Sequence, residues 1–455
     1  MAKKFFRSVL ILILAVCLLA PPLPVAAATG EEVLTDLTGL SGMPAAPSIE
    51  APSAILIEAK TGAILYAKNA DEQHYPASIT KIMTALLTIE NCSLDETVTF
   101  SYRATHELEE NSSGIARTEG EELSVRDCLY ALLIASANEV AQALAEHVSG
   151  TIEDFAVLMN QRAADLGCTN THFANPSGLN NPEHYTSAHD MALIMREAVK
   201  NPTFLEVDST TRYTIPATNK HSEPLAISMS HQLLLDGANR YEYAVAGKTG
   251  YTSLAGYTLV TYAVKDDMEL ICVVMDGPTS ESRYTSTRAL FDYGFNNFQM
   301  IHLNQYSGGT PLETDTGSGQ YLGSNILSLT TTDEDWLVLP TSLPFSSLDT
   351  QVSWGGENGE SSLASITYSY QGTPVGTATL TVKEDADSAF PFNGASVNGQ
   401  RRGSISVWTL ALYGGIAAGM VLLVLLLLAL GRRSRRKRAV YPGASRRRSR
   451  GRRRR

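Results

Sequence analysis

The apolar residues between positions 53 and 298 change their spacing three times along the chain. From Ser124 to Val199 they recur at helical intervals, and a further helical pattern runs from Ser280 to Phe295. Short β-rich runs stand on either side of the first helical region; they are 54–57, 63–66, 257–264 and 269–275. Strands at both ends of a run of helices predict an α/β (α+β) domain in which a sheet is covered by helices.

A serine and a lysine three positions apart open the apolar run that follows the first two β-rich segments. Ser78 and Lys81 would lie one turn apart on the same face of a helix, and Pro76 favours a helix that begins just after it. This spacing puts a nucleophilic hydroxyl next to an amine that could serve as its base. The alternative is structural, because Ser78 could cap the helix and Lys81 could be a surface residue.

A second polar element, Ser136-Ala137-Asn138, separates two helical runs. In a turn, its hydroxyl and its amide could both face a cleft, where the hydroxyl would relay a proton and the amide would bind a peptide carbonyl. The alternative is that this segment caps the helix that follows it.

A third element, Lys248-Thr249-Gly250, follows Gly247 in a strand-like segment. The lysine charge and the threonine hydroxyl could bind a carboxylate, and glycines at a strand end let a substrate backbone approach closely. The alternative is an ordinary turn.

Taken in order, S-x-x-K, S-x-N and K-T-G form the signature of serine enzymes that react with penicillin. Over residues 51–298 the chain resembles the D-alanyl-D-alanine carboxypeptidases, the low-molecular-mass penicillin-binding proteins. The resemblance implies the penicillin-binding and β-lactamase-like transpeptidase fold for residues 53–298. Further motifs that carry it are Glu58-Ala59-Lys60-Thr61-Gly62, Asn175-Pro176-Ser177-Gly178-Leu179, His184-Tyr185-Thr186-Ser187-Ala188 and Gly247-Lys248-Thr249-Gly250-Tyr251-Thr252.

The resemblance also implies a mechanism. Ser78 would attack the carbonyl carbon between the two terminal D-alanines of a peptidoglycan stem peptide, and Lys81, as a neutral amine, would take the serine proton. Ser136 would pass a proton to the leaving amine, and water would hydrolyse the acyl-enzyme. β-Lactams would acylate the same serine. The resemblance leaves open which base operates in each step.

Substrate binding is implied for the other polar residues of the three motifs. The residues concerned are Asn138, Lys248, Thr249, Gly250 and Tyr251. Asn138 would hold the substrate amide, while Lys248 and Thr249 would bind the terminal carboxylate. The backbone N–H groups of Ser78 and Tyr251 would form the oxyanion hole. We assign no substrate contact to residues 229–234, because they depart from the family pattern.

Two other functions stay open. A β-lactamase of the same fold would need a carboxylate that activates water, and no convincing E-x-x-x-N element supplies one. A non-catalytic cell-wall-binding protein would have no use for the nucleophile.

We expect neither a metal nor a cofactor, because His184 and His189 do not share a helix face and the chain has no H-E-x-x-H motif and no glycine-rich phosphate loop.

The two ends of the chain predict export and membrane attachment. Lys3, Lys4 and Arg7 precede an apolar run, as in a signal peptide, and 407–430 is an uncharged apolar run followed by arginine clusters. By the positive-inside rule the tail is cytoplasmic and the catalytic domain lies outside the bacterial cell membrane. The predicted regions are a signal peptide (1–28), a flexible leader (29–52), a catalytic domain (53–298), a small β-rich domain (299–387), a stalk (388–406), a transmembrane helix (407–430) and a basic tail (431–455).

The exported part is acidic and has few cysteines. Residues 29–400 carry 47 acidic and 17 basic side chains, a formal charge of −30, so nucleic acid is not expected as a partner. Four cysteines remain after removal of the signal peptide and have no C-x-x-C spacing. They predict free thiols rather than a disulfide framework.

Overall fold

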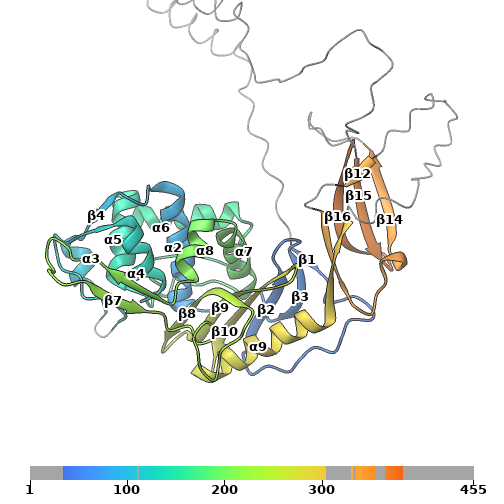
Figure 1. Ribbon diagram of the computed structural model, residues 1–455, viewed down its shortest axis with the longest axis horizontal. Helices are drawn as coiled ribbons and strands as arrows, with labels where there is room; N and C mark the ends of the chain where they lie inside the picture. Colours follow the sequence, from blue (N-terminus) through green and yellow to red (C-terminus); the bar gives the residue numbers. More distant parts are fainter. Residues whose placement is uncertain (1–33, 110–111, 304–328, 332–334, 355–363, 383–455) are drawn as a thin grey trace, which may run out of the picture. The chain divides into compact units, whose positions relative to one another are not determined.

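The computed structural model in Figure 1 describes residues 34–109, 112–303, 329–331, 335–354 and 364–382. Its main sheet has six strands in the order β1-β3-β2-β10-β9-β8. Neighbouring strands are antiparallel, except that β1 runs parallel to β3. The strands are β1 (Thr35–Asp36), β2 (Ser53–Glu58), β3 (Ala63–Lys68), β8 (Ala244–Thr252), β9 (Gly256–Lys265) and β10 (Met268–Gly277).

Both faces of this sheet are buried, and alternate residues of each strand point to opposite faces. In β10, Ile271 and Val273 belong to one core, which they share with the central helices, whereas Leu270 and Cys272 belong to a second core. Burial on both sides explains why the central strands β2 and β10 are nearly continuous apolar runs in the sequence.

Helices cover the two faces. The described helices are α2 (Lys81–Asn91), α3 (Tyr102–His106), α4 (Val125–Leu133), α5 (Asn138–Ser149), α6 (Ile152–Asp165), α7 (Ala188–Val199), α8 (Pro202–Asp208) and α9 (Ser280–Asn297). Both α7 and α9 contact β2, β9 and β10, α7 from the core of the central helices and α9 from the second core. The predicted fold class, a sheet covered by helices, is thereby confirmed.

The starts of these helices differ in a way that bears on function. Six begin with a side chain that accepts a backbone N–H; these caps are Ser101, Ser124, Thr151, Ser187, Asn201 and Thr279. The two others, α2 and α5, follow Thr80 and Ala137 and have no side-chain cap. The structure therefore does not support the capping alternatives for Ser78 and for the segment of Asn138.

Smaller sheets complete the fold. The pairs are β4 (Thr97–Thr99) with β5 (Glu122–Ser124), β6 (Arg212–Ile215) with β7 (Leu225–Ser228), and β11 (Phe298–His302) with β13 (Trp336–Pro340). A four-stranded antiparallel sheet has the order β12-β16-β15-β14, with β12 (Leu329–Thr331), β14 (Asp349–Trp354), β15 (Ala364–Tyr370) and β16 (Thr373–Val382). A small β-rich domain after α9 was predicted and is confirmed.

One expectation does not fit the structure. The segment 29–52, predicted as a flexible leader, is described from Leu34 onward and is packed: Thr35 and Asp36 form β1, and Leu37 and Ala51 are fully buried. Proline and glycine stop a helix from forming there, but they do not prevent an extended chain from burying its apolar side chains.

Two further expectations concern the thiols and the chain ends. Cys92, Cys128, Cys168 and Cys272 are free thiols, as predicted. Within the described ranges, no helix is long and apolar enough to cross a bilayer. The predicted signal peptide, stalk, transmembrane helix and basic tail lie outside those ranges.

Candidate active site

Ser78 and Lys81 lie where a short 3-10 turn, η1 (Ala77–Thr80), runs into α2. Ala77 has a φ of 52°, which residues other than glycine seldom adopt, so the chain turns sharply just before Ser78. Lys81 is fully buried. Its Nζ lies 3.1 Å from Ser78 Oγ, 2.7 Å from Asn138 Oδ1 and 2.6 Å from the Ser177 carbonyl oxygen.

The surroundings of Lys81 disfavour its charged form. Burial first, and then the charge of Lys248, hold the pKa of Lys81 well below its usual range, while Glu139 acts in the opposite direction. This shift favours the neutral amine, the form whose lone pair can accept a proton.

Ser136 and Asn138 lie in the turn between α4 and α5. Ser136 has a φ of 58°, and its buried Oγ has no hydrogen-bond partner among the described residues. Asn138 is the first residue of α5, and its backbone N–H donates to the Ser113 carbonyl at 2.9 Å. Its side-chain Oδ1 accepts from Lys81 Nζ, and α5 has no side-chain cap. A strained residue with an unpaired hydroxyl is typical of a functional site rather than of a stable turn.

Strand β8 carries Lys248, Thr249, Gly250 and Tyr251 along the edge of the main sheet. At Gly250, a Cβ atom would lie 2.2 Å from Thr258 Oγ1 and 3.0 Å from the backbone nitrogen of Ser78. Glycine therefore lets β8 approach η1, which brings the third motif next to the first. An edge strand also leaves alternate N–H groups without a strand partner. The Tyr251 side chain itself is exposed and packs on Tyr257, with ring centroids 4.5 Å apart.

Lys248 is buried, and other charges surround it. Its Nζ donates to the Thr249 carbonyl at 3.1 Å. Burial lowers the pKa of Lys248 to about 8, Asp208 opposes this shift, and Arg283 adds to it. Burial also raises the pKa of Asp208 to about 7, against the effect of Lys248. Arg283 donates to the Gly250 carbonyl at 3.1 Å. The cluster is a buried, cationic region beside Thr249, suited to an anionic group.

Several residues of the site carry no assignment from sequence reasoning. Ser177 belongs to the Asn-Pro-Ser-Gly-Leu motif, which could have pointed to it, and its carbonyl accepts from Lys81. Its neighbour Gly178 has a φ of 85°, and a Cβ there would lie 1.8 Å from the Ala77 carbonyl oxygen. Asp208, Glu139 and Arg283 had no local signal.

The segment 229–234, to which the sequence assigned no substrate contact, lies close to the third motif. Ser230 Oγ is 3.1 Å from Thr249 Oγ1, and His231 is buried with its Nε2 2.9 Å from Thr261 Oγ1. Ser230 thus lies beside a predicted substrate-binding hydroxyl. His231 instead packs against the main sheet through its contact with Thr261. Burial lowers the pKa of His231 to about 3.

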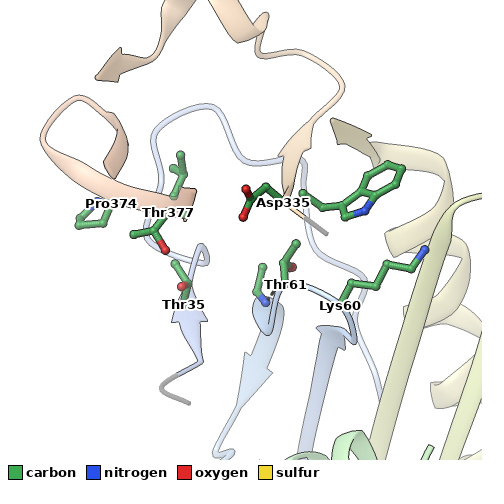
Figure 2. Close-up of a pocket in the computed structure, with 10 residues that line it drawn as sticks. Thr35, Lys60, Thr61, Asp335, Pro374 and Thr377 are labelled. Carbon is green, nitrogen blue, oxygen red and sulfur yellow. Dashed lines mark hydrogen bonds between the residues drawn. The ribbon is translucent and has the colours of Figure 1, made fainter. Parts of the chain in front are cut away.

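A separate pocket of about 270 Å³ lies away from these residues (Figure 2). Thr35, Lys60, Thr61, Asp335, Pro374 and Thr377 are among the residues that line it. None of the predicted site residues belongs to it. The candidate active site is therefore defined by its hydrogen bonds and charges and not by this pocket.

Comparison with known proteins agrees with this geometry. A family model described as D-alanyl-D-alanine carboxypeptidase matches residues 41–279. The chain is similar to D-alanyl-D-alanine carboxypeptidase DacF of Bacillus subtilis, with 36% identity over 258 residues, 55% of this chain and 63% of that protein. It is also similar to D-alanyl-D-alanine carboxypeptidase DacB2 of Mycobacterium tuberculosis, with 32% identity over 254 residues, 55% of this chain and 84% of that protein. The chain thus spans less than two thirds of the length of DacF.

Solved structures give the same relationship. Penicillin-binding protein 5 of Haemophilus influenzae superposes with a TM-score of 0.61 at 28% identity, covering 74% of this chain and 98% of that one. Penicillin-binding protein 6B of Escherichia coli superposes with a TM-score of 0.58 at 26% identity, covering 76% of this chain and 98% of that one. Both structural alignments cover more of this chain than the family model, which matches residues 41–279.

Proposed function

We propose that this chain, which belongs to the D-alanyl-D-alanine carboxypeptidase family, is a serine hydrolase that removes the terminal D-alanine from peptidoglycan stem pentapeptides. The resemblance stated on the three motifs is confirmed by the family match. The reaction would pass through an acyl-enzyme on Ser78, and β-lactams would acylate the same residue.

The hydrogen bonds of Lys81 are the observation that carries this proposal. A neutral amine has two N–H donors and one lone pair. The Ser177 carbonyl oxygen and Asn138 Oδ1 can only accept, so they take both donors. In the structure Nζ also donates to Ser78 Oγ at 3.1 Å; in the neutral amine, the lone pair is left to face that hydroxyl and would accept the serine proton. The contact and the lowered pKa of Lys81 together support Lys81 as the base that activates Ser78.

Acylation would follow from this arrangement. Ser78 Oγ forms a bond to the carbonyl carbon of the penultimate D-alanine while its proton passes to Lys81 Nζ. As the tetrahedral intermediate collapses, the C–N bond breaks, and the proton passes through Ser136 Oγ to the leaving nitrogen. The unpartnered Ser136 hydroxyl supports this role, because a relay group must be able to exchange partners. Water then hydrolyses the ester and restores Ser78.

Substrate binding would use the charges and backbone of β8. Lys248 would attract the terminal carboxylate, and the Thr249 hydroxyl would donate to it. Asn138 would hold the substrate amide with its amide nitrogen, since its oxygen faces Lys81. The backbone N–H groups of Ser78 and Tyr251 would stabilise the oxyanion. In serine hydrolases, loss of one such donor typically lowers kcat by about 10²- to 10³-fold. The close approach of Gly250 to the Ser78 nitrogen supports this pairing.

The proposal is tested by D-alanine release from a pentapeptide ending in two D-alanines, with the full chain in detergent. We expect release by the wild type, its block by penicillin, and its loss in Ser78→Ala. Rapid penicillin hydrolysis without D-alanine release would favour the β-lactamase alternative. Retention of peptide binding in the absence of either activity would favour the wall-binding alternative.

The remaining expectations concern placement in the cell. We propose that residues 1–28 are removed as a signal peptide, that 407–430 span the membrane, and that the basic tail 431–455 stays in the cytoplasm. The β-rich domain 299–387 and the stalk 388–406 would then lift the active site toward the wall. Protease added to intact cells should remove the catalytic domain and leave the tail protected. Deletion of 301–387 without effect on wall trimming would contradict the spacer role.

A further inference from the structure

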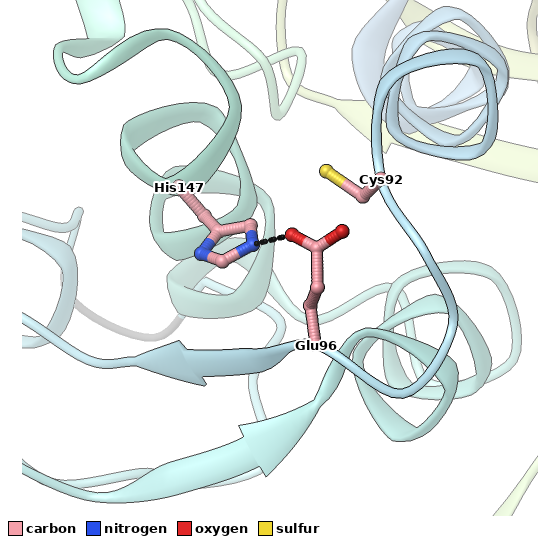
Figure 3. A group of neighbouring side chains, drawn as sticks. All are labelled: Cys92, Glu96 and His147. Atoms are coloured by element: carbon pink, nitrogen blue, oxygen red, sulfur yellow. Dashed lines mark hydrogen bonds and ion pairs between the residues drawn. The ribbon is translucent and has the colours of Figure 1, made fainter.

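Three side chains with different donor atoms converge at the end of α2 remote from Ser78. Cys92 follows the last residue of α2, Glu96 lies just before β4, and His147 lies in the last turn of α5. The Cys92 sulfur, a Glu96 carboxylate oxygen and a ring nitrogen of His147 all lie within 4.8 Å of one another. Figure 3 shows the sulfur and the carboxylate, both from the connection between α2 and β4, directed toward the imidazole ring of His147 on α5.

Backbone hydrogen bonds hold Cys92 and Glu96 in place. The Cys92 N–H donates to the Thr88 carbonyl at 3.0 Å, and the Glu96 carbonyl accepts from the Val125 N–H at 2.9 Å. Glu96 Oε1 accepts the Ser93 N–H at 2.6 Å, and Glu96 Oε2 lies 3.0 Å from His147 Nε2. One carboxylate oxygen is thus oriented by the protein and the other faces the cluster, the arrangement that orients ligands in metal sites.

The donor set is specific in its chemistry. Thiolate, imidazole and carboxylate together suit Zn²⁺, whereas Ca²⁺ and Mg²⁺ prefer oxygen ligands alone. Zinc bonds of about 2.0–2.3 Å require ligand atoms about 3.3–3.8 Å apart in a tetrahedron. The Glu96 and His147 side chains are 44% and 22% exposed, so small rotations can open the 3.0 Å contact and draw in the sulfur.

We propose that Cys92, Glu96 and His147 form a zinc site with three protein ligands and one solvent position. In the absence of metal, burial raises the pKa of the Cys92 thiol, and Glu96 adds to this. Zinc binding would displace the thiol proton to solvent, so metal affinity should increase with pH.

The site would tie two helices together at their far ends. At their near ends α2 and α5 are already joined, because Lys81 starts one, Asn138 starts the other, and the two side chains are hydrogen-bonded. The metal would lie about 16 Å from Lys81 along the 11 residues of α2. Its effect is therefore on stability and not on the chemistry at Ser78.

Cobalt is the probe of choice, because a thiolate ligand to Co²⁺ gives a near-ultraviolet charge-transfer band. The full chain is purified in detergent without a histidine tag, reduced, treated with chelator and titrated with Co²⁺ and then Zn²⁺. We expect the band to saturate at one cobalt per chain, to disappear on addition of zinc, and to be absent in Cys92→Ser. Affinity in His147→Ala and in Glu96→Gln should fall at least about tenfold.

Cys168→Ser is the matched control, because Cys168 is another partly buried thiol whose sulfur donates instead to the Asp190 carbonyl. This variant should keep the cobalt band. Zinc should raise the melting temperature of the wild type and of Cys168→Ser but not of Cys92→Ser, with circular dichroism to verify that each variant is folded. No band in the reduced wild type, a band that survives Cys92→Ser, or an equal zinc-induced shift in all three proteins would overturn the proposal.

Discussion

Gly178→Ala is the substitution that most directly tests how the candidate site is built. At Gly178 the added Cβ would lie 1.8 Å from the Ala77 carbonyl oxygen and 2.4 Å from the Ala77 carbonyl carbon, both backbone atoms. Cβ contacts under 3.0 Å essentially never occur. The segment of Gly178 and the turn before Ser78 must therefore separate by at least about 1.2 Å, which is the difference between the 3.0 Å limit and the 1.8 Å from the added Cβ to the Ala77 carbonyl oxygen.

Two costs add up at this position. The φ of 85° at Gly178 is unfavourable for any side chain, by about 1–2 kcal/mol. Forcing a methyl group into a packed site adds about 1–3 kcal/mol. Gly167→Ala is the matched control, since Gly167 has a φ of 79° but no atom within 4 Å of the added Cβ. We expect the free energy of unfolding to fall by about 1–2 kcal/mol in Gly167→Ala and by about 2–5 kcal/mol in Gly178→Ala.

Activity should separate the two variants more clearly. Ala77 directly precedes Ser78, and Ser177 directly precedes Gly178 and accepts from Lys81. Separation of the two segments thus moves the nucleophile relative to its base, and a displacement of about 1 Å can cost about 10²-fold in rate. Urea unfolding and the rate of fluorescent penicillin labelling of the folded protein measure the two effects. Equal losses of stability or of labelling rate in both variants would refute the argument.

Three more outcomes follow from the site. Lys81→Met should slow penicillin labelling by about 10²- to 10⁴-fold, because no amine takes the Ser78 proton; stopped-flow labelling that stays fast would exclude Lys81 as the base. Ser136→Ala should leave the urea midpoint almost unchanged, since its hydroxyl has no described partner, and should lower D-alanine release about 10²-fold or more. The kcat/KM of D-alanine release should fall as pH rises through about 8, where Lys248 loses its charge. Because the Asp208 carboxylate raises the pKa of Lys248, Asp208→Asn should move this alkaline limb to lower pH, and an unmoved limb would exclude that pairing.

Local patterns were sufficient for most of the fold and for the motifs. The long helices have a regular apolar period, and the hairpin of β2 and β3 and strands β9 and β10 are short apolar runs; short-range sequence carries both signals directly. Ser78 and Lys81 are three residues apart, so their contact at 3.1 Å needs no knowledge of the tertiary fold. The same reasoning failed for β1, because two residues have no period, and the proline-rich context favoured a leader instead.

The rest of the site depends on tertiary packing. Asp208 lies at the end of α8 and Arg283 at the start of α9, yet both act on Lys248 in the middle of β8. Nothing in the neighbourhood of either residue in the sequence marks it as part of a site. Glu139 is adjacent to a motif residue, but its carboxylate faces the Ile115 N–H at 2.6 Å, a contact that only the folded loop creates.

The two buried lysines of the site have a consequence for the order of events. In the free protein the charge of Lys248 helps to keep Lys81 neutral, and hence able to act as a base. On the proposed mechanism, a substrate carboxylate bound at Lys248 would offset that charge and raise the pKa of Lys81. The proton affinity of Lys81 would then increase at the stage when it must take the proton of Ser78. A terminal carboxylate would therefore do more than anchor the substrate, because it would also prepare the base. On the proposed mechanism, a peptide with a free terminal carboxylate would therefore be cleaved in preference to an internal peptide bond.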